Sequence, residues 1–178
     1  MKILCIIPIY NEESRLKSLI EKILQFKKVD LRKIDFMMIN NGSNDGTKKL
    51  LKDLGLNFIT LRKNKGIGYS LLLGLKLAAK KNYDVLIHMA GNDKMTPFDL
   101  DKMIDPIINH NFDYVCGSRF LEKKNFKTNP LFRKVSIRLM SIFFLFIFKK
   151  IINNSIFGFR SFKVKKLIRY FNFLNIKK

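Results

Sequence analysis

Residues 86–97, LIHMAGNDKMTP, have the composition of a ligand-binding turn at the end of a strand. An apolar run ends there in small and polar residues just before a helix start, and Asp93 is the single acid of the stretch. Open α/β sheets bind their ligands outside the carboxyl ends of the strands, so a strand here would set Asp93 beside a ligand. We therefore predict that the chemistry of this protein is centred on Asp93.

A second polar turn, residues 8–13 (PIYNEE), follows the first apolar run of the chain. Pro8 ends a strand ladder, so Tyr10 could stack on a base and Glu12 could accept hydrogen bonds from base or ribose donors. The same residues also suit a helix cap with acids in the first turn. Taken alone, these residues favour the helix cap.

A third polar turn, residues 40–47 (NNGSNDGT), follows the next apolar run. Gly42 permits a tight turn, and Ser43, Asn44 or Asp45 can cap the following helix, so a solvated turn explains the composition unaided. Its position favours a function, because polar turns at the carboxyl ends of successive strands converge on one crevice.

Residues 64–70 (NKGIGYS) contain a glycine-bearing helix start with a lysine beside it. Backbone N–H groups at the beginning of a helix favour anions, and Lys65 next to Gly66 adds positive charge. The glycine pair has neither the spacing of a dinucleotide-binding fingerprint nor that of a phosphate-binding P-loop, so both are excluded.

These turns must be positioned by an α/β fold, because apolar runs rich in Ile, Val and Phe alternate with helical patterns. Thr96, Pro97 and Asp99 form a helix cap, a first-turn proline and an acid that matches the helix dipole. Strands are predicted at residues 2–8, 34–39, 57–61, 84–89 and 114–118, and helices at 12–26, 45–54, 66–80 and 97–108.

The positive charge of the chain is large and unevenly distributed. The 178 residues, 47% of them hydrophobic, suit one domain and carry a formal net charge of +21. Residues 119–178 hold 16 basic residues and one acid, and so contribute +15 of that total. Such an excess favours a polyanionic partner or an anionic membrane surface. We found no recognised RNA- or DNA-binding module, so a nucleic-acid partner ranks last.

The basic part of the chain contains a Phe-rich segment, residues 129–150. Its apolar stretch, residues 139–148, is well under the roughly 20 residues that a membrane-spanning helix needs. A helix lying in the membrane interface, with Phe143 and Phe144 among the lipid tails, is favoured over a buried core helix with solvated ends. Residues 155–162 and 163–170 are expected to return to the sheet as a strand and a helix, with Arg160 either at the site or purely structural.

The cysteine pattern favours a cytoplasmic protein. Cys5 and Cys116 lie in apolar runs, which suits reduced buried thiols better than a disulfide framework. The first apolar run meets Pro8 and acids instead of a cleavage site, so we interpret it as a buried strand and not as a signal peptide. His88 and His110 have no ligand spacing that would suggest zinc.

Six motifs in order resemble the family 2 glycosyltransferases: residues 7–13, 40–47, 64–68, 86–97, 117–120 and 158–160. The branch they resemble is that of dolichyl-phosphate mannose synthases and related polyprenyl-phosphate glycosyltransferases. The resemblance implies a single Rossmann-like GT-A nucleotide-sugar domain with a mostly parallel central sheet and a basic, Phe-rich C-terminal helical segment. Residues 1–118 would be the α/β core and residues 119–178 the acceptor- and membrane-associating part of the same domain.

The resemblance also implies inverting sugar transfer from a nucleotide-diphosphate sugar to a polyprenyl phosphate or another membrane glycan acceptor, at the cytoplasmic face of a membrane. The nucleotide-sugar would be bound by Pro8, Tyr10, Glu12, Asn40, Gly42, Asn64, Lys65, Gly66, Asn92 and Lys94. The acceptor phosphate and the membrane would be met by Arg119, Arg133, Lys134, Arg138 and Arg160. Arg119 would also serve catalysis, together with Asp93 and Asn154.

The sequence departs from the family pattern at several acids. Asn40 and Asn41 replace two acids, although an amide oxygen can still bond a base edge. The positions of the usual ligands of Mg²⁺ or Mn²⁺ hold Ala90, Asn92 and Lys94 in this chain. These replacements should reduce the affinity for a divalent cation substantially. Two residues could compensate for the missing metal ligands. Asp93 could bind the metal after a one-residue shift of the turn, which we favour slightly, or Lys94 could neutralise the diphosphate.

A lipid-phosphate acceptor tolerates such losses, because a phosphate monoester, with a second pKa of roughly 6, is already largely ionised near neutral pH and needs no general base. What it needs is positive charge, which the last third of the chain supplies. The alternative is a weakened homologue that binds nucleotide-sugar or lipid without turnover.

The membrane hypothesis predicts salt-sensitive binding to anionic liposomes, measured by co-sedimentation. Replacing Phe143 and Phe144 by Ser should reduce this binding, because apolar area is lost from the lipid-facing side. Equal binding of the protein to RNA would contradict the membrane preference.

Overall fold

The computed structural model describes residues 1–117 and 158–173, with the side chains of residues 170–173 left out. The chain divides into two compact units, one of Met1–Val115 with Arg160–Lys178 and one of Cys116–Phe159. Among the predicted site residues, Arg119, Arg133, Lys134, Arg138 and Asn154 lie outside the described residues, as do Phe143 and Phe144.

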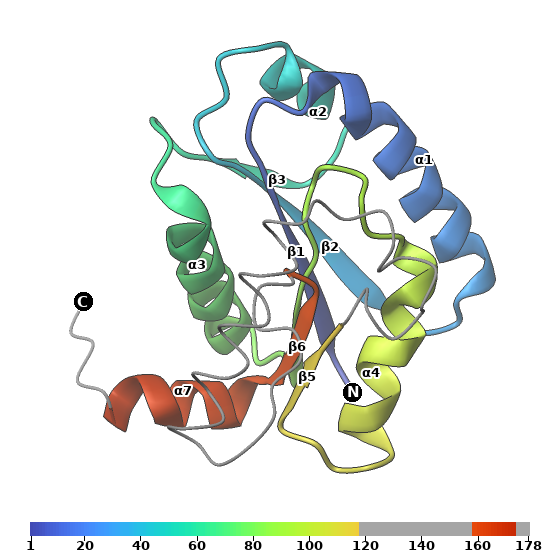
Figure 1. Cartoon of the computed structure of the whole chain (residues 1–178), viewed down its shortest axis with the longest axis vertical. Coiled ribbons are helices and arrows are strands. Elements are labelled where there is room, and N and C mark those ends of the chain that lie inside the picture. Colours follow the sequence, from blue (N-terminus) through green and yellow to red (C-terminus); the bar gives the residue numbers. More distant parts are fainter. Residues whose placement is uncertain (118–157, 174–178) are drawn as a thin grey trace, which may run out of the picture. The chain divides into compact units, whose positions relative to one another are not determined.

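A six-stranded sheet forms the centre of the first unit, in the order β3-β2-β1-β4-β6-β5 (Figure 1). β1 pairs in parallel with β2 and β4, and β2 pairs in parallel with β3. β6 runs antiparallel to β4. The strands are β1 (Ile3–Ile9), β2 (Ile34–Asn40), β3 (Phe58–Thr60), β4 (Val85–His88), β5 (Tyr114–Cys116) and β6 (Arg160–Lys163). The predicted mostly parallel sheet is therefore confirmed.

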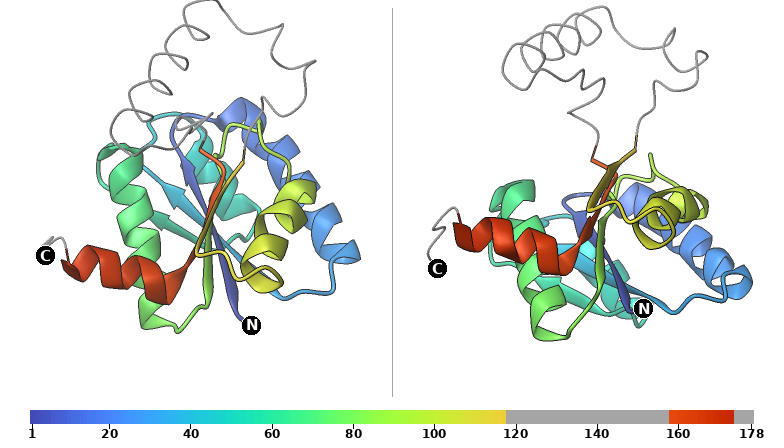
Figure 2. Two further views of the ribbon diagram at one scale, coloured as in Figure 1. Left: turned by 60° about the horizontal axis from the view of Figure 1, so that its bottom comes forward. Right: turned by 90° about the horizontal axis from the view of Figure 1, so that it is seen from below.

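Helices cover both faces of this sheet (Figure 2). One face carries α3 and α7, which pack with Leu4 and Ile6 of β1 into one apolar cluster. α1 and α4 lie on the other face, and α2 contacts α1. The helices are α1 (Glu13–Val29), α2 (Thr47–Asp53), α3 (Gly66–Lys80), η1 (Pro97–Asp99), α4 (Leu100–Ile108) and α7 (Val164–Phe173).

Most predicted elements are found within a few residues of their expected positions. The helix predicted at residues 66–80 has the bounds of α3, and the strand and helix expected to return to the sheet are β6 and α7. The predicted cap before η1 is confirmed, since the Thr96 side chain accepts a hydrogen bond from the N–H of Phe98. In the described part of the chain, no helix has the length and apolar character to span a bilayer.

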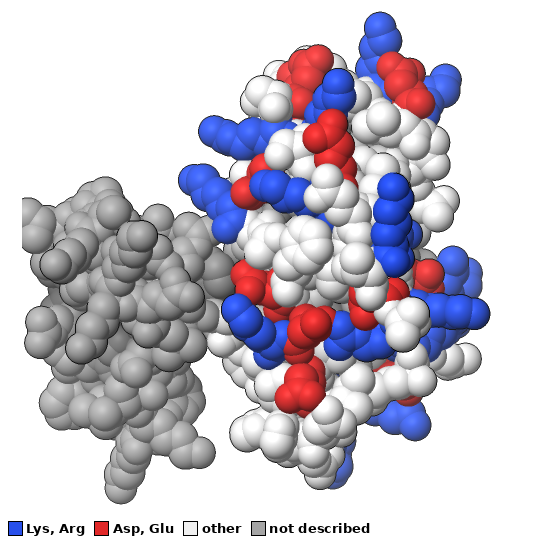
Figure 3. Space-filling model, turned by 90° about the vertical axis from the view of Figure 1, so that its right-hand side faces the viewer, with Lys and Arg blue, Asp and Glu red and all other residues white. Residues whose placement is uncertain are grey.

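The surface around α1 and α4 mixes both signs of charge. Figure 3 shows Lys and Arg interspersed with Asp and Glu over this face, so that the basic residues do not form one continuous patch on it. The mixture fits the sequence, in which residues 119–178 hold +15 of the total charge of +21.

Near the amino-terminal ends of the strands, the buried residue Tyr83 forms a partly buried polar contact with Asp35. Its hydroxyl donates to Oδ2 of Asp35 over 2.6 Å, and the ammonium of Lys2 lies 4.5 Å from the centre of its ring. Burial, and then the bond to Asp35 and its charge, raise the pKa of Tyr83 to about 12. The folded protein therefore holds this proton to a higher pH than the unfolded chain does.

A Tyr83→Phe variant tests this contact. Because the pKa of Tyr83 is raised on folding, its contribution to stability is present below pH 10 and is lost as the pH rises toward 12. The free energy of unfolding of the wild type, from urea titrations, should fall more steeply over this range than that of the variant. Equal slopes for the two proteins would contradict the shift.

Candidate functional site

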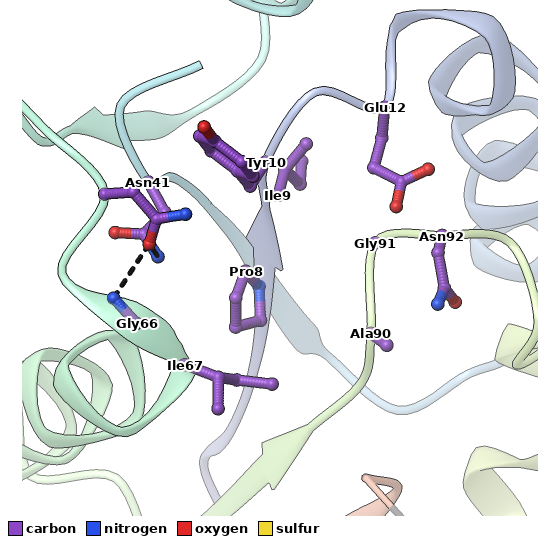
Figure 4. Close-up of a pocket in the computed structure, with 11 residues that line it drawn as sticks. Pro8, Ile9, Tyr10, Glu12, Asn41, Gly66, Ile67, Ala90, Gly91 and Asn92 are labelled. Atoms are coloured by element: carbon purple, nitrogen blue, oxygen red, sulfur yellow. Dashed lines mark hydrogen bonds between the residues drawn. The ribbon is translucent and has the colours of Figure 1, made fainter.

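A pocket of about 290 Å³ opens at the carboxyl ends of β1 and β4, beside the beginning of α3 (Figure 4). It brings together residues from four separate turns, and in three of them the lining includes predicted binding residues. The lining residues are Pro8, Ile9, Tyr10, Glu12, Asn41, Asn64, Gly66, Ile67, Ala90, Gly91 and Asn92. Pro8 lies between two walls, one with Asn41 and Gly66 and the other with Ala90, Gly91 and Asn92.

The turns after β1 and β2 are joined by reciprocal hydrogen bonds. The N–H of Asn11 donates to the Ser43 hydroxyl (3.1 Å), and Oδ1 of Asn11 accepts from the N–H of Asn44 (3.0 Å). The N–H of Glu12 donates to Oγ1 of Thr47 (3.1 Å). Asn11 has a φ of 52°, a conformation that asparagine tolerates better than most residues. Ser43, one of the residues predicted as a helix cap, therefore joins the two turns beside Tyr10 and Glu12, whereas α2 begins after Gly46 without a side-chain cap bond.

The acids in these two turns complete the junction. The N–H of Glu13 donates to Oδ2 of Asp45 (3.2 Å), and Oε2 of Glu13 accepts from the N–H of Gly46 (2.9 Å). Partial burial raises the pKa of Asp45, but hydrogen bonds from Thr47 and Glu13 outweigh it and the pKa is lowered overall. Asp45 therefore holds the turn as a carboxylate.

Asn41 joins the turn after β2 to the beginning of α3. Its side chain is only 4% exposed, its amide donates to Oδ1 of Asn64 (3.0 Å), and its Oδ1 accepts from the N–H of Lys65 (3.0 Å). Oδ1 of Asn64 also accepts from the N–H of Gly66 (2.8 Å), the bond drawn in Figure 4. Asn41 was not among the predicted binding residues, and its place in a polar pair ending a strand was the available signal.

Asn40, which was predicted to line the pocket, is fully buried at the end of β2 instead. Its Oδ1 accepts from the N–H of Ser43 (3.0 Å), so it shapes the turn from within. Successive side chains of an extended segment point to opposite sides, which explains why only Asn41 reaches the pocket. Gly42, also predicted to bind the nucleotide-sugar, contributes through its backbone conformation. Its φ is +76°, and a Cβ there would lie 2.4 Å from the carbonyl carbon of Lys63, so the turn requires glycine.

The turn after β4 forms the opposite wall. The N–H of Gly91 donates to the carbonyl of Pro8 (3.1 Å), which fixes this turn against the end of β1. A Cβ at Gly91 would lie 2.6 Å from Cγ1 of Ile9, so this approach requires glycine. Oδ1 of Asn92 accepts from the N–H of exposed Lys94 (3.3 Å).

Asp93 is not among the residues that line this pocket in the described chain. Its carboxylate instead accepts from the Ser18 hydroxyl (2.8 Å) and from the ammonium of Lys22 (2.9 and 2.8 Å), both on α1. Ala90 offers no side-chain oxygen and Lys94 is a cation. Since hard divalent cations need several oxygen ligands, this donor set does not fit Mg²⁺ or Mn²⁺.

Two predicted basic residues, Lys65 and Arg160, are not among the residues that line the pocket. Lys65 is exposed, with its ammonium 4.4 Å from the centre of the Tyr69 ring. Arg160 is half-buried in β6, in register with His88 of β4. The other predicted acceptor residues lie outside the described part of the chain.

The fold and the site define a protein of the GT-A glycosyltransferase class. The solved structure of glucosyl-3-phosphoglycerate synthase from Mycobacterium tuberculosis, bound to Mn²⁺, UDP-glucose and phosphoglyceric acid, matches with a TM-score of 0.67 at 17% identity. The match covers 92% of this chain and 57% of that one. The sequence profile of Glycosyl transferase family 2 matches residues 4–171, so the chain belongs to this family, as its motifs predicted.

The names of two relatives of known activity include a dolichyl phosphate or a polyprenol. The UDP-N-acetylglucosamine–dolichyl-phosphate N-acetylglucosaminyltransferase of Methanococcus voltae is 30% identical, over 91% of this chain and 69% of the relative. The polyprenol monophosphomannose synthase of Mycolicibacterium smegmatis is 24% identical, over 90% of this chain and 61% of the relative. The chain thus spans about two thirds of the length of these two proteins.

An Asn41→Ala variant should lose stability and nucleotide affinity together. Removing this buried amide leaves its partners on Asn64 and Lys65 without their bond, at a cost of about 1–3 kcal/mol. Urea unfolding and calorimetric titration with UDP and GDP measure the two effects. Asn44→Ala is the matched control, because that exposed side chain enters none of these bonds. Loss of the same size in both variants would contradict a specific role for Asn41.

Proposed function

We propose that the protein is a glycosyltransferase that moves a sugar from a nucleotide-diphosphate sugar to a polyprenyl or dolichyl-type phosphate, or to another membrane glycan acceptor. The observation that carries the proposal is the pocket where four family motifs meet. The relatives that name a dolichyl phosphate or a polyprenol support the choice of acceptor.

The pocket suits a nucleoside at the side of β1. Tyr10 is 42% exposed and can cover a base with its ring. The Glu12 carboxylate, which pairs with Arg15 at 3.0 Å, retains acceptor capacity for a ribose hydroxyl or a base N–H. The amides of Asn41 and Asn92 provide both donors and acceptors for base and sugar edges. We assign nucleotide-sugar binding to these residues together with Pro8 and Asn64.

The diphosphate is assigned to the beginning of α3 and to nearby lysines. α3 is 15 residues long, and its amino terminus carries partial positive charge where Gly66 meets the pocket. Lys65 adds a full charge next to this helix start. Lys94, on the turn that forms the other wall, is the second basic side chain that we assign to the donor phosphates.

The reaction itself requires little acid–base chemistry with a phosphate acceptor. An ionised phosphate oxygen forms the bond to the anomeric carbon, and the nucleoside diphosphate leaves with the bonding electrons, which inverts the configuration. The acceptor must be held in line by positive charge. We assign this role to Arg119 and Arg160 and to the basic residues Arg133, Lys134 and Arg138, with the protein peripheral on the cytoplasmic face of a membrane.

A weakened homologue that binds the donor without turnover is the second candidate. It is favoured by the replacement of the usual family acids at Ala90 and Asn92, and by Asn154 standing four residues before Gly158, where the family commonly has an acid. Donor binding is common to both candidates, so only transfer separates them.

A donor panel tests the proposal. Purified protein is mixed with vesicles containing polyprenyl phosphate and with labelled UDP, GDP or dTDP sugars, and label in the lipid phase is counted. We expect transfer from one donor, and a Tyr10→Ala loss of about 1–3 kcal/mol in nucleotide binding, the size of a base–aromatic stack. Phe112→Ala is the control, because this residue is 56% exposed and lies outside the pocket lining. Nucleotide binding without transfer would support the weakened homologue.

A further inference from the structure

We propose that Ser18, Lys22 and Asp93 form a clamp that positions Gly91 and Asn92 at the pocket, and that Asp93 is a positioning residue instead of a cation ligand. The inference rests on the proposed function only in that the pocket binds a nucleotide diphosphate. It assigns Ser18 and Lys22 a role that their sequence positions on a helix did not suggest.

The clamp has three hydrogen bonds on one carboxylate. The Ser18 hydroxyl donates to Oδ2 of Asp93 over 2.8 Å. The Lys22 ammonium donates to both oxygens, at 2.9 and 2.8 Å. The Asp93 side chain is 15% exposed and the Lys22 side chain 39%, so the pair is sheltered from much of the solvent. This shelter reduces the screening that makes fully exposed ion pairs weak.

The backbone at Asp93 indicates why the turn needs this restraint. Its φ is 56°, in the left-handed region that glycine adopts most readily and aspartate tolerates. A glycine would satisfy the turn geometry alone, but it would have no carboxylate to bond to α1. The residue present combines the required backbone shape with the bond.

α1 holds the same segment at a second point. Ser18, Lys22 and Phe26 are spaced at i, i+4 and i+8, so they form one stripe of the helix. Phe26 makes an edge contact with Phe98, with ring centres 5.9 Å apart. Between these two anchor points and the Gly91–Pro8 bond, the whole turn after β4 is fixed.

α1 also begins at the pocket, so it links the two sides of the site. Glu12 immediately precedes the helix and lines the pocket. The clamp therefore sets the distance between the Tyr10–Glu12 side and the Gly91–Asn92 side, which is the width available to a nucleotide. This arrangement explains how residues outside the pocket act on binding.

The clamp conflicts with cation binding by Asp93. Both of its oxygens already face the Lys22 ammonium, so a divalent cation would have to displace a positive charge from the same oxygens. The neighbouring side chains at Ala90 and Lys94 add no oxygen ligand. Asp93 thus stabilises the wall of the pocket without contacting the diphosphate.

Three single variants, one double variant and a matched control test the clamp by calorimetric titration with UDP, GDP and dTDP, each in Mn²⁺ and in EDTA. Lys22→Met and Asp93→Gly should each weaken binding by about tenfold, equally in both buffers, because the wall is displaced. Asp93→Asn, which keeps an acceptor for Ser18, should be intermediate. Lys102→Met, which removes an exposed 2.8 Å pair with Asp99, should bind like the wild type. The double variant of Lys22 and Asp93 should be no weaker than Asp93→Gly.

Two results would overturn the inference. One is loss of Mn²⁺-dependent binding in Asp93→Gly with Lys22→Met unchanged, which is the behaviour of a metal ligand. The other is wild-type affinity in both variants, or fully additive losses in the double variant. If the wild type binds none of UDP, GDP and dTDP, the proposed function fails, and amide hydrogen exchange decides the clamp alone. Exchange at Gly91 and Lys94 should then rise in both variants but not in Lys102→Met, and unchanged exchange would reject the clamp.

Discussion

The hydrogen bonds between the turns at the carboxyl ends of β1 and β2 are the interaction on which the site depends. Those turns leave the regular ladder, so their backbone groups need side-chain partners. Asn11 and Ser43 supply them reciprocally, and Asn41 extends the same junction to the beginning of α3. A pocket formed by four short turns thereby acquires a fixed outline although few of its lining residues belong to the sheet itself.

The charges of the site are arranged differently from the family pattern that the motifs suggest. Asn41 and Asn92 are neutral where the family usually has acids, and the Asp93 carboxylate is paired with the Lys22 ammonium. The described pocket therefore presents little negative charge to an incoming diphosphate, which removes one reason for a bridging cation. The positive charge at the beginning of α3 and in residues 119–178 is what we propose attracts the donor and acceptor phosphates.

The position of α1 connects these two features. Its first residues follow directly from the turn with Tyr10 and Glu12, and its stripe of Ser18, Lys22 and Phe26 supports the turn after β4. A helix is stiff along its length because each turn is bonded to the next. The same rigid helix, α1, therefore holds the binding surfaces on both sides of Pro8. The site does not depend on the packing of loops alone.

The sequence by itself determined the order of strands and helices, the family and the four turns that meet at the pocket, because hydrophobic periodicity, caps and glycine positions act locally. Only the tertiary structure decided which asparagine of the pair 40–41 reaches the pocket, since that depends on the direction in which the strand ends. The partner of Asp93 was equally hidden, because Ser18 and Lys22 lie 75 and 71 residues away in the chain. A local pattern shows that a carboxylate is available at a turn, whereas packing of α1 against that turn decides what it binds.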